Sequence, residues 1–276
     1  MTSKTQPDIS VLISVYGRDN SKYFRLALES IYNQTSAPKQ IVLVEDGPIS
    51  KDLEQIVKEY KQKDKIRLDI VKLKNNKGLG VALNEGLKKC KYDYIARMDS
   101  DDICDKDRIK KQWNFIEKNK DIDIFSGTIK EFSEKTENIT GERRVPKQHK
   151  DIISFSKKRN PFNHPAVVFR KKAVLDAGGY NESYHLFEDY YLWIRMLMNG
   201  CKTSNLDDTL VYMRTSSDSI KRRGGIKYAT ELLRFQTWLL KVKWISPLDY
   251  AIYSIPHFVV CILPNGLRAM IYKTIR

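Results

Sequence analysis

The chain has 276 residues, of which 41% are hydrophobic and 11% aromatic, and its formal net charge is +15 at pH 7. This composition supports one large folded domain, or one domain with an extension, and excludes a disordered chain. The positive charge favours polyanionic partners, which include nucleic acid, anionic lipid and phosphorylated substrates, and does not choose among them.

The cysteines and the amino terminus indicate the compartment. The four cysteines lie far apart and form no CxxC pair, which argues against a zinc site and against a disulfide framework. Residues 1–8 are polar and contain no apolar core of a signal peptide. We therefore expect a reducing, cytoplasmic environment.

The first part of the chain alternates between strand and helix patterns. Short apolar runs predict strands, and segments with apolar residues at helical spacing predict the helices between them. The predicted strands are residues 9–16, 40–45, 66–73 and 94–98, and the predicted helices are residues 23–32, 51–61 and 78–90. Repeated units of this kind predict an α/β fold with a doubly wound, mainly parallel sheet.

The second part is less regular. It contains predicted strands at residues 122–128, 165–170 and 209–214, and a predicted helix at residues 188–199 that Gly200 closes. From Gly225 onward the chain becomes helical, aromatic and basic. We therefore expect one domain over residues 1–220 and a helical extension over residues 221–276.

Polar segments follow three of the predicted strands. They are Tyr16-Gly17-Arg18, Glu45-Asp46-Gly47 and Asp99-Ser100-Asp101-Asp102. Ligands of parallel α/β sheets bind beyond the carboxyl ends of the strands, so these segments predict a binding site at that edge.

The acidic segment predicts a divalent metal. Asp99, Asp101 and Asp102 place three carboxylates within four residues, which is unfavourable unless a cation or hydrogen-bond donors compensate. On an extended segment Asp99 and Asp101 point the same way. Mg²⁺ and Mn²⁺ prefer oxygen ligands and usually bridge one or two carboxylates to substrate phosphates. The alternative is that Asp102 or Asp105 only caps a helix that begins near Lys106.

A series of segments resembles the family-2 glycosyltransferases with a GT-A fold. The closest resemblance is to the amylovoran-type bacterial enzymes of exopolysaccharide and O-antigen synthesis. The segments are SVLISVYGR (10–18), ALESIYNQT (27–35), IVLVEDGP (41–48), NNKGLGVALNEGL (75–87), YIARMDSDDIC (94–104), NHPAVVFRK (163–171), GGY (178–180) and EDYYLWIRMLMNG (188–200). The resemblance implies a nucleotide-binding half at residues 1–105 and an acceptor-binding half at residues 106–220.

The resemblance also implies an activity. It implies inverting, metal-dependent transfer of a hexose, galactose or glucose, from a UDP-sugar to a sugar carried on undecaprenyl diphosphate. Such transfers build the repeat units of O-antigen, capsule or exopolysaccharide at the cytoplasmic face of the inner membrane. The QxxRW motif of processive synthases is absent, so we expect a single transfer to each acceptor.

The resemblance assigns roles to individual residues. Asp189, the second acid of the Glu188-Asp189 pair, would be the general base, which removes the acceptor proton during attack. Asp101 would be the principal metal ligand, together with Asp99. The residues implied at the nucleotide are Val15, Tyr16, Arg18, Asp46, Asn76, Gly78, Arg97 and Asp99. Without the resemblance, Glu188 and Asp189 are equally well explained as first-turn acids that the helix dipole favours.

Three further segments of the sequence bear on this site. Some family members carry a metal-binding His after a Tyr-Arg segment, but residues 212–217 contain none. Arg222 is a candidate clamp for a diphosphate, because guanidinium groups match phosphate oxygens; the alternative is a solvated basic loop. His164 is a candidate residue of the acceptor pocket, although a lone histidine is more often structural.

The C-terminal extension predicts contact with a membrane. Residues 252–263 are apolar, but they are shorter than the roughly 20 residues that span a bilayer. The basic and aromatic residues around them are Trp238, Lys241, Lys243, Trp244, Tyr250, Arg268, Tyr272, Lys273 and Arg276. This pattern predicts peripheral docking to the anionic inner leaflet, and the alternative is a helix packed on the domain core.

Three other functions remain as alternatives. A nucleic-acid-binding module would explain the charge but needs stacking aromatics or a basic recognition helix, and we expect no nucleic-acid partner. A sugar nucleotidyltransferase needs a glycine-rich, arginine-bearing loop after its first strand, where only Gly17-Arg18 stands. A non-catalytic sugar-nucleotide-binding relative is the third, and the intact acidic positions argue against it.

Overall fold

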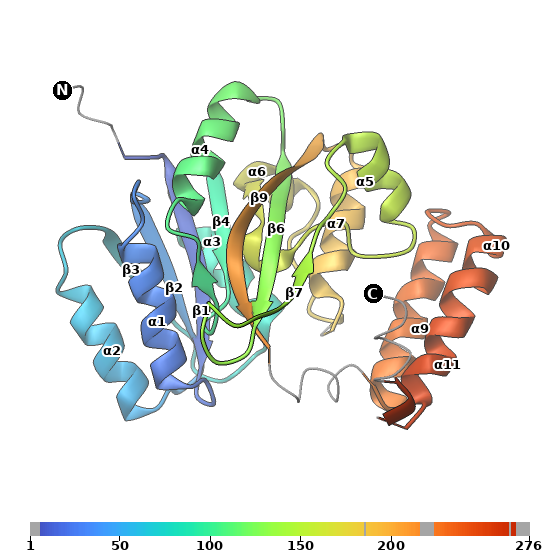
Figure 1. The fold of residues 1–276 in the computed structure, drawn as a ribbon, viewed down its shortest axis with the longest axis horizontal. Helices are drawn as coiled ribbons and strands as arrows, with labels where there is room; N and C mark the ends of the chain where they lie inside the picture. The colour runs from blue at the N-terminus through green and yellow to red at the C-terminus, as the bar shows by residue number, and fades with distance from the viewer. Residues whose placement is uncertain (1–5, 185, 216–223, 265, 269–276) are drawn as a thin grey trace.

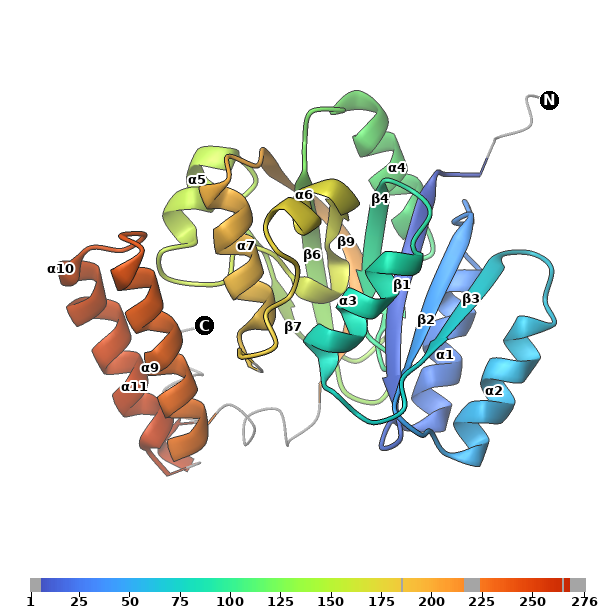
Figure 2. The ribbon, with the colours of Figure 1, turned by 180° about the vertical axis from the view of Figure 1, so that it is seen from behind.

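The computed structural model describes residues 6–184, 186–215, 224–264 and 266–268. Within these residues a nine-stranded sheet carries helices on both faces, and a helical hairpin follows it at one end (Figures 1 and 2). The doubly wound α/β arrangement is therefore confirmed.

The N-terminal half of the sheet is parallel. Its elements are β1 (Ile9–Tyr16), α1 (Ser21–Tyr32), β2 (Gln40–Asp46), α2 (Lys51–Lys61), β3 (Arg67–Lys72), α3 (Leu79–Lys89) and β4 (Tyr94–Met98). The strands lie in the order β3-β2-β1-β4, and every neighbouring pair is parallel. Tyr16 lies opposite Asp46, and Ile13 opposite Met98, so the carboxyl ends of β1, β2 and β4 share one edge.

The second half of the sheet is mixed. Its elements are β5 (Ile103–Cys104), α4 (Arg108–Lys118), β6 (Ile124–Phe132), β7 (Ile139–Arg143), α5 (His149–Phe155), a 3-10 turn (His164–Ala166), β8 (Val168–Arg170), α6 (Lys171–Asp176), α7 (Glu188–Met198) and β9 (Thr203–Arg214). β8 is antiparallel to both β4 and β6, while β9 runs parallel to β6 and antiparallel to β5. The strand predicted at residues 165–170 is wrong in its first part, where the chain forms the 3-10 turn instead.

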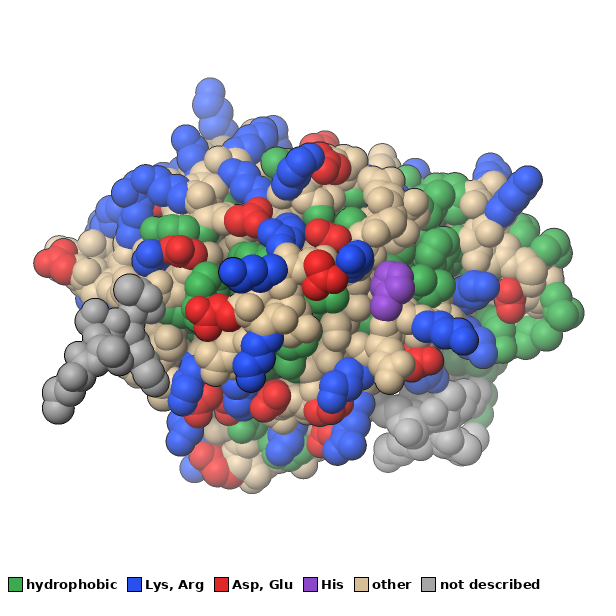
Figure 3. All heavy atoms as spheres, turned by 90° about the horizontal axis from the view of Figure 1, so that it is seen from above, with side chains coloured by type: hydrophobic (Ala, Val, Ile, Leu, Met, Phe, Trp, Pro, Cys, Tyr) green, Lys and Arg blue, Asp and Glu red, His purple; other side chains and the backbone are tan. Residues whose placement is uncertain are grey.

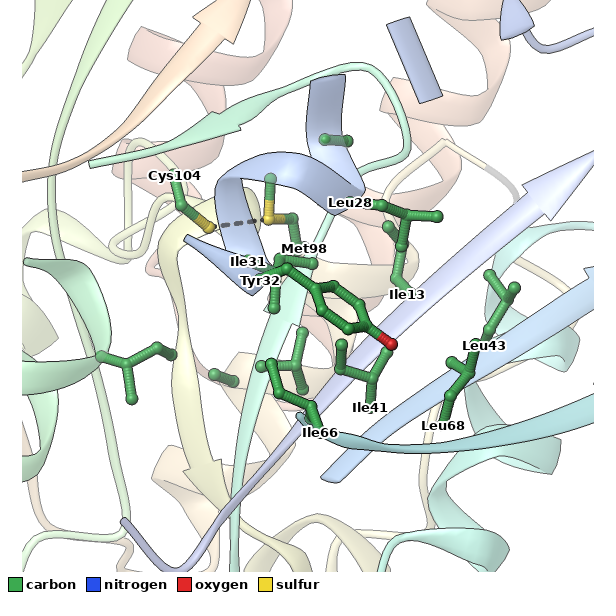
Figure 4. Packing of buried hydrophobic residues seen from close by; sticks show 14 of the residues in the cluster. Ile13, Leu28, Ile31, Tyr32, Ile41, Leu43, Ile66, Leu68, Met98 and Cys104 are labelled. Carbon is green, nitrogen blue, oxygen red and sulfur yellow. Dashed lines mark hydrogen bonds between the residues drawn. The ribbon is translucent and has the colours of Figure 1, made fainter. Parts of the chain in front are cut away.

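A core on one face of the sheet fixes the acidic segment. Leu28 of α1 lies beside Ile13 of β1, and Ile41, Met98 and Cys104 belong to the same core (Figure 4). Cys104 Sγ lies 2.9 Å from Met98 Sδ. Residues 99–102 run between these two buried side chains, so the packing of Met98 and Cys104 in the core fixes the position of both ends of the segment.

On the other face, α3, α6 and α7 pack around Trp193. This side chain is 0% exposed and contacts Phe162, Phe169 and Tyr180 through ring edges. A fully buried large apolar side chain stabilises a fold by roughly 1.5–3 kcal/mol. The indole therefore anchors α7, the helix that carries Glu188 and Asp189, to the sheet.

The C-terminal hairpin consists of α9 (Ile226–Lys241), α10 (Pro247–Asp249), a π-helical turn (Tyr250–Ser254) and α11 (Ile255–Ile262). Phe235 and Leu239 of α9 pack against Tyr190 and Ile194 of α7, so α9 is packed on the domain core. None of the helices formed by the described residues is both long and apolar enough to cross a membrane.

Candidate functional site

The turn after β1 contacts the acidic segment after β4. Asp19 donates its amide to the Tyr16 carbonyl at 3.0 Å, and its Oδ2 accepts from the Tyr16 amide at 3.2 Å. The same Oδ2 accepts from Ser100 Oγ at 2.7 Å. Burial raises the pKa of Asp19, with the nearby Asp99 acting in the same direction. Asp19 was not predicted from the sequence, because this contact joins residues 81 positions apart.

The predicted residues of the first loop differ in exposure. The Val15 side chain is 1% exposed and belongs to the core, whereas Tyr16 is 41% exposed at the edge of the sheet. Arg18 is also exposed. Tyr16 and Arg18 are therefore the side chains of this segment that a ligand at the sheet edge can reach.

Asp46 joins the end of β2 to the amino terminus of α3. Its Oδ1 accepts from the Lys77 amide at 2.8 Å and its Oδ2 from the Gly78 amide at 3.0 Å. Asn76 Nδ2 donates to the Asp46 carbonyl at 3.3 Å. Gly78 has a φ of +89°, a conformation that glycine adopts readily. The structure thus brings Asp46, Asn76 and Gly78 together, and each carboxylate oxygen keeps one lone pair for a ligand.

Arg97 and Asp99 form an ion pair at the end of β4. Arg97 Nη1 donates to Asp99 Oδ2 at 2.5 Å, and Nη2 donates to Oδ1. The Arg97 side chain is 1% exposed and that of Asp99 is 34% exposed. A buried guanidinium therefore presents one fixed carboxylate to the solvent side of the loop.

The charge of Arg97 reaches both groups of predicted catalytic acids. It lowers the pKa of Asp101 in the acidic segment and of Asp189 on α7, opposing the effect of burial in each. It also acts on Glu188 and on His164. The charge of Arg97 therefore influences the acids after β4 and the acids of α7, although the two groups lie far apart in the sequence.

Asp101 is a carboxylate that a cation would stabilise. Part of its surface reaches solvent, yet the surrounding protein desolvates it, and Asp99 and Asp19 lie near, so its pKa is raised to about 6. No group of three or more His, Cys, Asp and Glu side chains in the described part of the chain is arranged to hold a metal. Asp99 and Asp101 offer oxygen ligands of the kind that Mg²⁺ or Mn²⁺ prefers, and such ions usually take their remaining ligands from water and substrate phosphates.

Asp102 is a buried carboxylate that bonds the acidic segment to β9 and does not cap a helix. It is 1% exposed, and its Oδ1 accepts from the Arg214 amide of β9 at 2.8 Å. Burial, followed by Asp99 and Asp101, raises its pKa well above the ordinary value. α4 begins at Arg108, and its N-cap residue Asp107 makes no side-chain capping bond. Asp102 therefore does not cap this helix, whereas Asp105 Oδ1 accepts from the Asp107 amide at 3.1 Å, so the capping interpretation holds for Asp105 and leaves the metal prediction open.

Arg214 is a contact of the acidic segment that the sequence did not indicate. Its Nε donates to the Asp101 carbonyl at 3.1 Å, and its guanidinium lies between the rings of Tyr23 and Phe132, at 3.9 and 4.5 Å from their centroids. Nη2 is buried and has no hydrogen-bond partner. Arg214 thus bonds the backbone of Asp101 from the end of β9. This is the region where some family members carry a metal-binding histidine.

Asp189 lies in the first turn of α7, as predicted. Asn160 Nδ2 donates to its Oδ2 at 2.6 Å, and the Tyr190 amide donates to its Oδ1 at 2.7 Å. Burial raises its pKa, which makes the carboxylate a stronger base than an exposed aspartate. The hydrogen bond from the Tyr190 amide is that of a first-turn acid, which agrees with the helix-dipole interpretation and does not conflict with a role as a base.

Glu188 lines a cavity of about 120 Å³ at the amino terminus of α3. The cavity wall also includes residues 77–81 and 181–182. Glu188 Oε2 is buried without a hydrogen-bond partner. Burial, and secondly the charge of Asp189, raises the pKa of Glu188 to about 8.

His164 lies beside Tyr180 and Trp193, close to this site. Its Nε2 lies 3.0 Å from the Tyr180 hydroxyl, and its ring packs against Trp193. Burial, followed by the positive charge of Arg97, lowers its pKa well below the ordinary value. The remaining predicted residue, Arg222, lies outside the described residues.

Comparison with known proteins agrees with this geometry. The family model described as glycosyl transferase family 2 matches residues 10–179. The chain is 37% identical over 273 residues to the UDP-Gal:alpha-D-GlcNAc-diphosphoundecaprenol beta-1,3-galactosyltransferase of Escherichia coli, covering 99% of this chain and 98% of that protein. It is 35% identical over 265 residues to the amylovoran biosynthesis glycosyltransferase AmsE of Erwinia amylovora, covering 96% and 97%.

A solved structure supports the fold. The mannosyltransferase PcManGT of Pyrobaculum calidifontis, determined with GDP-Man and Mn²⁺, superposes with a TM-score of 0.64 at 15% identity, over 96% of this chain and 72% of that chain. The GT-A fold and the resemblance to amylovoran-type enzymes are both confirmed. With the matched region running through the strand-end loops and the Arg97–Asp99 pair, the chain belongs to glycosyl transferase family 2 and is a glycosyltransferase.

Proposed function

We propose that the protein transfers a hexose, galactose or glucose, from a UDP-sugar to a sugar on a lipid diphosphate, with inversion at the anomeric carbon. The observation that carries this is the position of Arg97. It holds Asp99 at the end of β4, beside the acidic segment, and after burial, which is the main cause, its charge contributes to the pKa of both Asp101 and Asp189. An inverting transfer needs these two functions, one at the leaving diphosphate and one at the attacking hydroxyl, within one site.

The donor would bind along the carboxyl edge of β1, β2 and β4. Asp46, with Asn76 and Gly78 beside it, would contact the uracil, and Tyr16 and Arg18 would line the pocket. Val15 would contribute through the backbone. Arg97 and Asp99 would lie beside the ribose and diphosphate. The bidentate hold of Arg97 on Asp99 supports this, because it fixes the Asp99 carboxylate in one orientation at the end of the strand.

Asp99 and Asp101 would hold the divalent cation, Mn²⁺ or Mg²⁺. When bound, the cation supplies positive charge for the departing diphosphate. The raised pKa of Asp101 supports this assignment, because two neighbouring carboxylates are costly without a counter-charge. Arg222 is proposed as a further diphosphate clamp, and His164 as part of the acceptor pocket.

Asp189 would act as the general base. The acceptor hydroxyl oxygen bonds to the anomeric carbon as the bond from that carbon to UDP breaks, and the hydroxyl proton passes to Asp189. Asn160 supports the role by fixing Oδ2 at 2.6 Å, which keeps the carboxylate in one orientation. The products are the extended lipid-linked sugar, UDP and one proton.

Relatives support the acceptor class. The Escherichia coli relative is named for transfer to GlcNAc-diphosphoundecaprenol, and AmsE for amylovoran biosynthesis. We extend this to undecaprenyl-diphosphate-linked intermediates of O-antigen, capsule or exopolysaccharide synthesis. Because such an acceptor is membrane-bound, the enzyme would work peripherally at the cytoplasmic face of the inner membrane.

A donor screen tests the proposal. Purified protein is incubated with Mn²⁺, a panel of UDP-sugars and a synthetic GlcNAc- or GalNAc-diphosphate-lipid, and the product is analysed by mass spectrometry and NMR. We expect one hexose to be added with inverted anomeric configuration. UDP binding without transfer from any donor would favour the non-catalytic alternative and overturn the proposal.

A further inference from the structure

An apolar stripe lies on the outer side of the C-terminal hairpin. It consists of Leu248, Ile252, Ile255, Val259 and Ile262, which are 68%, 52%, 50%, 46% and 47% exposed. Within α11, Ile255, Val259 and Ile262 are spaced by four and three residues, which places them on one side of the helix, and Leu248 and Ile252 precede them in α10 and the π-helical turn. Single exposed apolar residues are ordinary, but a continuous row of them marks an interaction surface.

The opposite side of the same helices is fixed to α9. Cys261 is 0% exposed and packs with Ala229 and Leu232 of α9. Ser254 Oγ donates to Gln236 Oε1 of α9 at 3.1 Å, in a buried position. Because α11 already uses this side for packing, the apolar stripe is held facing outward.

Basic side chains surround the apolar stripe. Lys158 Nζ lies 4.8 Å from the centroid of the Tyr253 ring, which is itself 37% exposed. Arg159 is exposed in the same loop, and its charge reaches His257 of α11. Lys241 and Lys243 are exposed where α9 ends. Figure 3 shows the hydrophobic surface at the end of the molecule that carries the hairpin, with Lys and Arg side chains beside it.

The acids near this surface are few among the described residues. Asp249 is the acid within the hairpin's outer helices, and it is engaged by Ser246, whose amide and hydroxyl both donate to its Oδ2. The pKa of Asp249 is lowered by these bonds, and the charges of Lys157 and Lys158 act in the same direction. Asp249 therefore carries a negative charge, which Lys157, Lys158 and Arg159 of the neighbouring loop outnumber.

The hairpin is also coupled to the helix that carries Asp189. Phe187 stacks on Phe235 of α9 with centroids 5.3 Å apart, and Tyr191 lies 4.1 Å from Trp238 of α9. Asp189 stands between Phe187 and Tyr191 in the sequence. Displacement of α9 would therefore be transmitted to the turn of α7 that holds Asp189.

We propose that the apolar stripe and its basic neighbours dock the protein into the interface of an anionic lipid bilayer. Apolar side chains at the acyl boundary with cations at the headgroups are the chemistry of an interfacial helix. A second copy of the chain fits less well. In a two-fold pairing the same patch faces itself, which would bring Lys158 and Arg159 of both copies together.

The docking would set the orientation of Asp189 toward a membrane-held acceptor, through α9 and α7. This second part rests on the proposed transferase function, whereas the docking itself does not. The two can therefore fail separately, and the experiment measures them separately.

Flotation of the full-length chain with vesicles of phosphatidylglycerol and phosphatidylcholine tests the docking. Ile255→Glu places a charge in the apolar stripe. Leu175→Glu on α6 is the matched control, since Leu175 is 51% exposed and Ile255 is 50% exposed. We expect Ile255→Glu to reduce the bound fraction by about 10-fold, and Leu175→Glu to float like the wild type. Lys158→Glu/Arg159→Glu should weaken binding to anionic vesicles only.

Two controls keep the result interpretable. Circular dichroism establishes that each variant is folded, and Ile255→Ser/Val259→Ser repeats the test without introducing charge. Light scattering records the oligomeric state. Wild-type flotation by the folded stripe variants would overturn the proposal. So would a dimer that these variants convert to a monomer while vesicle binding persists, because the apolar stripe would then be an interface between copies.

Transfer assays test the coupling. Ile255→Glu should retain wild-type activity on a short-chain, water-soluble acceptor and lose about 10-fold on an undecaprenyl-length acceptor in vesicles. Equal loss on both acceptors would contradict an orienting role. If the wild type transfers to neither acceptor, the proposed function fails while the flotation result stands.

Discussion

Arg97 lies in the last pleat of β4 and Asp99 directly follows the strand, and the buried guanidinium of Arg97 holds both carboxylate oxygens of Asp99. Alternation along a strand brings residues i and i+2 to one face, so the pair is built into the strand geometry. Met98 between them points the other way, into the core under α1. The end of β4 is thereby fixed from both faces.

Arg97→Lys tests whether the two hydrogen bonds from the Arg97 guanidinium to Asp99 position the acidic segment. Lysine keeps the charge but cannot bond both oxygens in one plane, so Asp99 should lose its fixed orientation. We expect kcat/KM to fall about 100-fold, the size of effect that a displacement near 1 Å produces. Steady-state kinetics with the identified donor measure it.

The matched control for Arg97→Lys is Arg170→Lys. Arg170 Nη1 donates to Asp93 Oδ2 at 2.6 Å, at the opposite end of β4. This pair is partly exposed, so its loss should cost less than about 1 kcal/mol of stability and leave kcat/KM unchanged. Equal loss of activity in both variants would show that activity depends on the general stability of β4 and not on the two hydrogen bonds from Arg97 to Asp99.

Asp189→Asn tests the general base. The amide keeps the shape and can still accept from the Tyr190 amide, but it cannot take the acceptor proton. We expect kcat to fall about 1,000-fold, within the usual contribution of a general base, and the affinity for UDP with Mn²⁺ to stay unchanged. Kinetics and calorimetric titration with UDP separate the two effects.

Asn160→Ala is the companion to that variant. Asn160 donates to Asp189 Oδ2 and stands 29 positions away in sequence. Its removal should lower kcat by less than Asp189→Asn does, about 10-fold, because the base is retained but less well oriented. If either variant also lost affinity for UDP, Asp189 and Asn160 would be assigned to donor binding and not to the acceptor side of the site.

The strand-end segments could be read from the sequence because each depends on a local pattern. A buried apolar run followed by Asp46 or by Asp99 defines both the strand and the edge where its polar residue lies. The parallel order of β1, β2 and β4 follows from the repeated strand–helix unit. The sequence therefore predicted which residues gather at this edge, while their roles as ligands remain predictions.

The contacts that the sequence did not indicate are long-range. Ser100 meets Asp19 across 81 positions, and Asp102 meets the Arg214 amide across 112. β8 enters the sheet antiparallel between β4 and β6, and no local pattern specifies that insertion. The Asp19 contact depends on how the loops after β1 and β4 meet at the sheet edge, and the Arg214 contact depends on the packing of the second half, whose strands have weaker periodicity, so the sequence indicated neither residue.

Arg214→Ala tests the support of Asp101. The variant keeps the backbone bond to Asp102 and removes the Nε bond to the Asp101 carbonyl. Outer-sphere supports of this kind change metal affinity by about 10–100-fold when lost. We expect the Mn²⁺ concentration for half-maximal activity to rise about 10-fold, with UDP affinity in EDTA unchanged.

Two substitutions of Tyr23 refine this test. Its ring lies 3.9 Å from the Arg214 guanidinium. Tyr23→Phe keeps the ring face and should behave as the wild type, whereas Tyr23→Ala removes the cation–π contact and should raise the Mn²⁺ requirement. A uniform loss of activity at every Mn²⁺ concentration in Arg214→Ala would contradict the assignment.

Glu188 should make the stability of the protein depend on pH. Burial raises its pKa from 4.5 to about 8, so the folded protein holds a proton that the unfolded chain releases between these values. The folded state therefore binds more protons in this window, and the free energy of unfolding falls as the pH rises from 4.5 to about 8. Below this window the carboxyl is protonated in both states and burying it does not lower the free energy of unfolding. Above the window the cost of burying the ionised carboxylate no longer changes with pH.

Glu188→Gln removes the ionisation while keeping the size of the side chain. We expect the variant to match the wild type near pH 4.5 and to be more stable at pH 8.5 by roughly 1–3 kcal/mol. Urea unfolding at both pH values measures the difference. Glu182→Gln is the control, since Glu182 is an exposed acid at the same cavity and its loss changes the net charge equally. A difference between Glu188→Gln and the wild type that stays constant with pH would show that the Glu188 carboxyl is already ionised in the folded protein at low pH.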